Sequence, residues 1–149
     1  MTGKADFTEQ EWALLLEGPP IAGLIVITAQ RGGTIRETLA MGKAYAEARQ
    51  QHGESELLDA ILAAKPEVHH TRYRSADELK QDGLARLRDA ISLLGFRASP
   101  DEVGGYRRFV LMVAEKVANA HREHGVAVSE AEQAAIDEIS AALSGPGES

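Results

Sequence analysis

The segment Ser99-Pro100-Asp101-Glu102 contains all the residues of a helix N-terminal capping motif. In a capping box, the hydroxyl of a Ser or Thr accepts from the backbone N–H three residues on, and a Glu at that position reaches back to the Ser or Thr amide. Pro100 then occupies the first helical position, where its missing N–H costs nothing. The segment therefore predicts a helix that begins at residue 100.

The same box recurs four more times along the chain, as Thr8 with Glu11, Thr34 with Glu37, Ser75 with Glu78, and Ser129 with Glu132. At the first box, Phe7 and Trp12 are spaced as a hydrophobic staple. Gly53, Gly95 and Gly125 stand where helix ends are expected, and Pro19, Pro20, Pro66 and Pro146 fall between the expected segments. These signals predict helices over 9–17, 20–30, 35–52, 55–64, 76–94, 100–123 and 130–143.

Apolar spacing supports an all-α fold. Leu84, Leu87, Ile91 and Leu94 step by three and four residues, which gives that helix one apolar stripe. Residues 21–27 are apolar all round, which is typical of a central helix covered by the others. Residues 24–28 are also compatible with a buried strand, although no convincing second strand is present to pair with it.

Composition bounds the class of protein. The chain has 149 residues, no Cys, 44 % hydrophobic and 26 % charged residues, and a formal charge of −7. We expect one compact helical domain over residues 1–143, a bundle of about seven helices, followed by a flexible tail over 144–149. The absence of Cys, of a signal pattern and of a long apolar run favours a cytoplasmic protein with no membrane span. Residues 123–149 carry six acidic side chains and no basic one, which disfavours nucleic-acid binding.

Two loops share an order of features. Residues 30–37 and 124–132 each pass from an apolar helix through glycine to a hydroxyl cap and a Glu, which predicts two pseudo-symmetric helix–loop–helix halves. With these loops the chain resembles the TerB-like tellurite-resistance family of all-helical bacterial proteins. The resemblance spans roughly residues 7 to 143 and implies a stress-associated protein whose loops bind divalent metal. In this chain His124 precedes the glycine where the family loop has Asp, and Arg31 precedes it in the first loop.

A metal site is the first candidate. His121 and His124 lie three residues apart near a helix end, so both rings face one side and can hold Zn²⁺ or Ni²⁺ together with Glu132. Without the loop Asp the site has fewer oxygen ligands for Ca²⁺. The alternative is that Glu37 and Glu132 are capping acids and that the His residues favour the negative end of the helix dipole.

A ligand or partner groove is the second candidate. Gly104 and Gly105 in a first helical turn cost roughly 1 kcal/mol each relative to Ala, so something must compensate. Close approach of another helix backbone is the ordinary reason, and a groove beside Tyr106, Arg107 and Arg108 is the alternative. The segment His69–Arg74 could stack a base or cover an acidic helix face. The segment Arg31–Thr34 could offer free amides to an anion or form a tight turn.

We expect a non-enzymatic interaction or stress-associated protein that docks a protein partner or a copy of itself, with no cofactor. A divalent-metal-binding protein that uses the second loop is the alternative. A small hydrolase or transferase is less favoured, because no nucleophile motif and no carboxylate pair between apolar residues is present in the sequence.

Overall fold

The computed structural model describes residues 4–29, 42–43, 45–47, 56–63, 75–122 and 130–144. The elements in this part of the chain are a 3-10 turn η1 (Lys4–Asp6) and the helices α1 (Glu9–Ala29), α3 (Glu56–Ala63), α4 (Ala76–Arg97), α5 (Pro100–Arg122) and α6 (Glu130–Ser144). Residues 42–43 and 45–47 are also helical, and no strand occurs among the described residues. The all-α prediction is confirmed, and the strand considered for 24–28 is wrong because these residues lie in α1.

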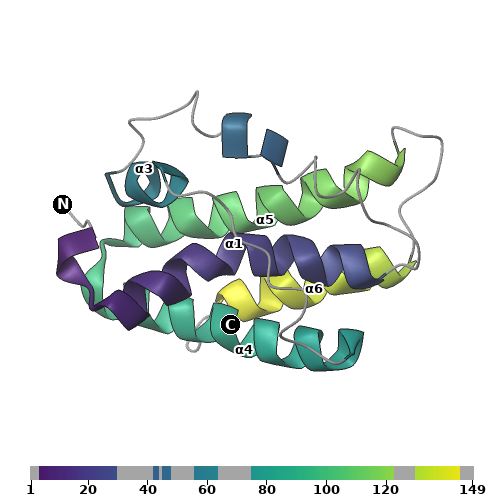
Figure 1. The fold of residues 1–149 in the computed structure, drawn as a ribbon, viewed down its shortest axis with the longest axis horizontal. Helices are drawn as coiled ribbons and strands as arrows, with labels where there is room; N and C mark the ends of the chain where they lie inside the picture. The colour runs from purple at the N-terminus through teal and green to yellow at the C-terminus, as the bar shows by residue number, and fades with distance from the viewer. Residues whose placement is uncertain are drawn as a thin grey trace.

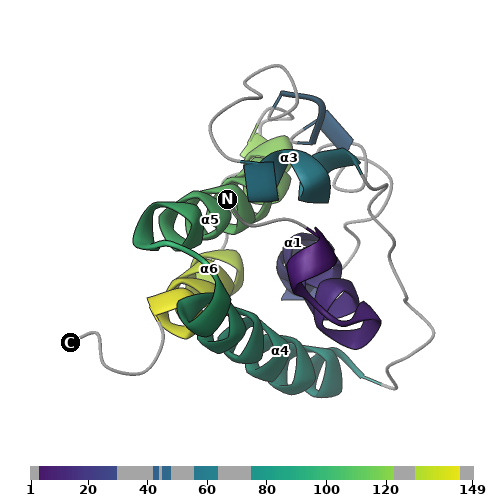
Figure 2. The same ribbon diagram turned by 90° about the vertical axis from the view of Figure 1, so that its left-hand side faces the viewer.

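Helices α1, α4, α5 and α6 run along the long axis of the molecule (Figure 1). Helix α1 packs against α4, α5 and α6 (Figure 2). Helix α3 contacts α5, and α3 and α4 lie at opposite edges of the molecule in both views. Burial follows the expected pattern, because every side chain from Ile21 to Val26 of α1 is buried. The prediction of a central apolar helix is therefore confirmed.

Capping boxes begin the helices as predicted. The Thr8 amide donates to Glu11 Oε1 at 2.8 Å and the Glu11 amide donates to Thr8 Oγ1 at 3.1 Å. Ser99 and Glu102 make the same reciprocal pair at 3.0 and 3.2 Å. The Glu78 amide donates to the Ser75 hydroxyl at 3.1 Å. The Phe7 and Trp12 rings lie 5.8 Å apart, which confirms the staple.

The break expected between residues 17 and 20 is wrong. Helix α1 runs continuously through Gly18, Pro19 and Pro20, all of which are buried. A proline inside a helix removes one N–H donor and usually ends the helix when the freed carbonyl finds no other partner. Here a side chain from α5 replaces the donor that Pro19 lacks, as described below. The apolar residues that follow the prolines are buried because the helix continues.

The predicted end of α4 at residue 94 is also wrong. Gly95 lies inside the helix, which ends at Arg97, and the extended residue Ala98 donates its amide to the Leu94 carbonyl at 2.7 Å. Gly95 does not end the helix. The helix instead continues to Arg97, just before the capping box at Ser99 that begins α5. The observed starts of α1, α4 and α5 agree with the predicted starts at residues 9, 76 and 100.

Several predictions concern residues outside the described ranges. Most of the helix expected over 35–52 and the loops over 30–37 and 123–129 lie there, so the internal repeat stays a prediction. The segments Arg31–Thr34 and His69–Arg74 and the tail over 145–149 lie there as well. Ser144, expected to open the tail, is instead the last residue of α6. Among the described helices, none is both long enough and apolar enough to cross a membrane.

Candidate functional site

The predicted groove residues lie in the first turns of α5 and differ in how deeply they are buried. Gly105 and Tyr106 are buried, Gly104 and Arg107 are half-buried, and Arg108 is exposed. At Gly104, an added Cβ would meet only Arg108 Nη1 of the same helix, at 3.4 Å. Close approach of another helix therefore does not explain Gly104.

Close helix approach is found instead at two other glycines. A Cβ on Gly83 of α4 would lie 2.7 Å from Ile21 Cγ2 and 2.9 Å from Ile25 Cδ1. A Cβ on Gly18 of α1 would overlap the Tyr106 hydroxyl and lie 3.2 Å from Tyr106 Cζ. Both glycines thus let α1 lie tightly against its neighbours, which real Cβ atoms would prevent.

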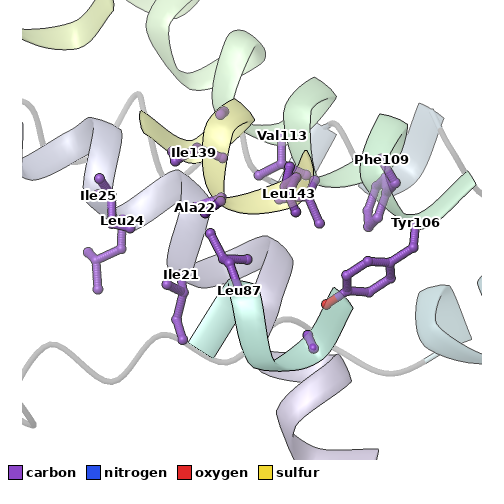
Figure 3. Packing of buried hydrophobic residues seen from close by; sticks show 14 of the residues in the cluster. Ile21, Ala22, Leu24, Ile25, Leu87, Tyr106, Phe109, Val113, Ile139 and Leu143 are labelled. Carbon is purple, nitrogen blue, oxygen red and sulfur yellow. The ribbon is translucent and has the colours of Figure 1, made fainter. Parts of the chain in front are cut away.

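Tyr106 is buried and reaches from α5 into the interior, with its hydroxyl pointing away from α5 (Figure 3). Its hydroxyl donates to the Leu15 carbonyl of α1 at 2.8 Å. In a regular helix that carbonyl accepts from residue 19, but Pro19 has no N–H. The Tyr106 hydroxyl therefore replaces the donor that Pro19 lacks, and Gly18 leaves the space for it.

The Tyr106 hydroxyl is suited to donating a hydrogen bond and unsuited to proton transfer near neutral pH. Burial raises the pKa of this hydroxyl far above its ordinary value, and the nearby Tyr45 and Glu17 raise it further. Ionisation would place a charge in an apolar interior beside a carbonyl oxygen, which is strongly unfavourable. Tyr106 thus stays protonated and holds the junction between α1 and α5.

Two arginines make further contacts between helices: Arg107 joins α5 to α6, and Arg86 joins α4 to α1. Arg107 Nη2 donates to the Ser144 carbonyl at the end of α6, at 3.3 Å, where a cation suits the helix dipole. Arg86 of α4 contacts Glu17 of α1 at 2.6 Å and Asp82 at 2.9 Å. The groove residues Tyr106 and Arg107 therefore make contacts that join α5 to α1 and α6, and a ligand groove there stays a prediction.

The structure describes one side chain of the predicted metal set. Glu132 lies in the first turn of α6 and is wholly buried. His121 lies in the last turn of α5, and its side chain and all of His124 fall outside the description. Among the described residues, no cluster of three or more His, Asp or Glu side chains could hold a metal ion. Metal binding by this set stays a prediction.

A surface that sequence reasoning missed lies on α4. Phe96 is 88 % exposed and is the one large hydrophobic residue left in solvent among the described residues. It shares the side of α4 away from the core with Gln81, Ala85, Arg88, Asp89 and Ser92, and we call these six residues the outer face of α4. Leu79, Leu87, Ala90, Ile91 and Leu94 form the buried side.

The signal for this surface was present in the sequence. Phe96 follows Leu94 by two residues, and so it falls off the apolar stripe of Leu84, Leu87, Ile91 and Leu94. An end to the helix at Gly95 would have left Phe96 in a loop, so only the longer helix shows that it lies on an exposed helical face.

Comparison of the chain with protein-family models, with curated proteins and with solved structures finds no match.

Proposed function

We propose that this protein is a non-enzymatic docking protein that binds a protein partner through the outer face of α4. Exposure of Phe96 is the observation that carries the proposal. Buried aromatic anchors supply most of the binding energy at protein interfaces, where they fill pockets in the partner. The TerB-like resemblance and its implied stress-associated role belong to this proposal and rest on the loop features of the sequence.

Phe96 offers a partner apolar surface that the rest of the described fold does not offer. Burial of a Phe side chain is worth roughly 1.5–3 kcal/mol, which is a large part of the free energy of a weak complex. The remainder of the outer face is small or polar, as is usual for the surroundings of a single anchor.

The end of α4 that bears Phe96 is held in place. Arg97 Nη1 donates to the Asp6 carbonyl at 2.8 Å, and Arg97 Nη2 lies 3.3 Å from Glu11 Oε2. Both partners belong to the N-terminal region, so the last turn of α4 is fixed against η1 and α1. A fixed anchor loses less conformational entropy on binding than a mobile one, which supports docking at this point.

A photo-crosslinking experiment tests the proposal. Phe96 is replaced by p-benzoylphenylalanine, which retains an aromatic ring, in the full chain expressed in its own host. Asn119, exposed on α5, carries the same probe as the matched control. We expect a discrete protein adduct from position 96 and none from position 119. Absence of an adduct at 96, or equal adducts at both positions, would contradict docking by this face.

A further inference from the structure

The outer face of α4 is self-complementary in charge. Arg88 and Asp89 are both exposed, and adjacent residues of a helix are turned by about 100° from each other. The line of Ala85, Ser92 and Phe96 runs between them, so Arg88 lies on one flank of this line and Asp89 on the other. One turn of the helix therefore presents a cation and an anion side by side.

The central line of the face allows another helix to approach closely. Ala85 and Ser92 are small and half-buried, and they repeat at a spacing of seven residues. Phe96 follows on the same line, four residues after Ser92. Small residues at a helix contact permit short interaxial distances, and a seven-residue spacing keeps one side of a helix turned toward its partner.

We propose that the outer face of α4 binds the same face of a second copy of this chain, with the two α4 helices parallel about a twofold axis. This inference rests on the docking function and names the partner. In a parallel pair, a twofold axis along the helices sets each flank against the opposite flank of the partner. Arg88 then meets the partner's Asp89, Asp89 meets the partner's Arg88, and the two Phe96 rings lie together.

An antiparallel pair fits these residues less well. There the twofold axis sets each flank against the same flank of the partner, and when the axis passes near residue 88, Arg88 faces its own copy. Like charges that face each other destabilise an interface, whereas opposite charges fix its register. The charge pattern therefore selects the parallel arrangement.

The contact is small, and so we expect a weak dimer. A single helix face offers less than the ~800 Å² that each partner buries in a standard stable complex. The net charge of −7 also opposes association, although salt near 0.15 M limits that repulsion to a range of about 8 Å. Dimerisation should accordingly depend on protein concentration.

Charge-reversal variants test the arrangement by sedimentation equilibrium. Arg88→Asp sets carboxylates against carboxylates, and Asp89→Arg sets guanidinium groups against guanidinium groups. Each single variant should dimerise roughly tenfold more weakly than the unchanged chain, from the loss and reversal of two exposed ion pairs. The double variant, and an equimolar mixture of the two single variants, should both recover association because opposite charges then face each other again.

A disulfide test shows whether the two copies meet along the line of Ala85, Ser92 and Phe96. The chain has no Cys, so a single introduced thiol can pair only with a second copy. Ser92→Cys should form a dimer under mild oxidation, because a parallel pair places residue 92 opposite itself, within the narrow distance range that a disulfide needs. Asn119→Cys on α5 is the matched control and should stay monomeric. Circular dichroism checks that each variant keeps its helix content.

The possible outcomes separate this inference from the docking function. An unchanged chain that stays monomeric up to about 1 mM would overturn self-docking. Single variants that associate as strongly as the unchanged chain, or a mixture that fails to recover, would overturn it too. If the probe at position 96 is then found joined to a different protein, the docking function stands without self-docking. If no adduct forms, both are wrong.

Discussion

The hydroxyl of Tyr106 donates to the carbonyl of Leu15 at 2.8 Å, and this carbonyl is the one that Pro19 leaves without a helical donor. The two residues are 91 positions apart in the chain. Gly18 makes the contact possible, since a Cβ there would overlap the hydroxyl. The Leu15 carbonyl of α1, which Pro19 leaves without a donor, and the buried Tyr106 hydroxyl of α5 thus provide each other's hydrogen-bond partner.

Tyr106→Phe should destabilise the protein, because it leaves the buried Leu15 carbonyl without a donor. We expect a loss of about 1–3 kcal/mol in the free energy of unfolding by urea. The same change should cost much less in a Pro19→Ala background, where residue 19 regains an N–H for that carbonyl. The double-mutant cycle should therefore show a coupling of at least about 0.5 kcal/mol. Additive effects of the two changes would show that the carbonyl is not what joins them.

Gly18 and Gly95 should respond in opposite ways to alanine. Gly18→Ala should lower the free energy of unfolding by about 1–3 kcal/mol, because the new methyl group would push against Tyr106. Gly95→Ala should raise it by about 0.5–1 kcal/mol, because α4 gains helix propensity and the Cβ meets nothing within 4 Å. Thermal or urea unfolding measures both. Stabilisation by Gly18→Ala would contradict the packing of the α1–α5 junction.

Stability should fall at alkaline pH because of Tyr106. The folded protein keeps this hydroxyl protonated, since burial raises its pKa, whereas the unfolded chain releases the proton near the ordinary value of about 10. The unfolded state then binds fewer protons, so the contribution is complete below pH 10 and declines above it, by up to about 1.4 kcal/mol per pH unit. Urea unfolding from about pH 8 to about pH 11.5 should show a steeper decline in the unchanged chain than in Tyr106→Phe. An equal decline of the unfolding free energy with pH in both proteins would contradict this role of Tyr106.

Glu132 tests the capping interpretation against the metal interpretation. As a capping acid it should tolerate Glu132→Gln, because Gln also completes a capping box, while Glu132→Ala should cost about 0.5–2 kcal/mol. We expect excess Zn²⁺, Ni²⁺ or Ca²⁺ to leave the melting temperature of the unchanged chain where it is. A rise with metal that disappears in Glu132→Gln would instead establish Glu132 as a metal ligand, since a ligand of the folded state must stabilise it. Loss of the same rise in His121→Ala and in His124→Ala would complete the predicted set.

Local signals predicted most of the described fold. The boxes at Thr8 and Ser99 act within four residues of chain, because each of their hydrogen bonds joins residues three positions apart. The burial of Leu87 and Leu94 followed from a spacing of three and four residues. Such features are visible in a sequence because the atoms involved are neighbours along it.

The candidate sites were less predictable. Tyr106 was predicted to line a groove, but its ring is buried and its hydroxyl donates a hydrogen bond to the Leu15 carbonyl of α1. Phe96 was not singled out, because a glycine before it is a usual sign of a helix end. In both cases the outcome depended on a residue far away in the sequence or on how far a helix continued.

By itself, the sequence determined that the described part of the chain is helical, where most of its helices begin, and that residues 21–26 lie at the centre. These follow from hydrogen bonds within one turn and from the burial of apolar side chains. Only the tertiary structure decided that α1 continues through Pro19 and Pro20. The donor that Pro19 lacks is replaced by the Tyr106 hydroxyl of α5, and no local pattern predicts that this hydroxyl, 91 positions away, will be there.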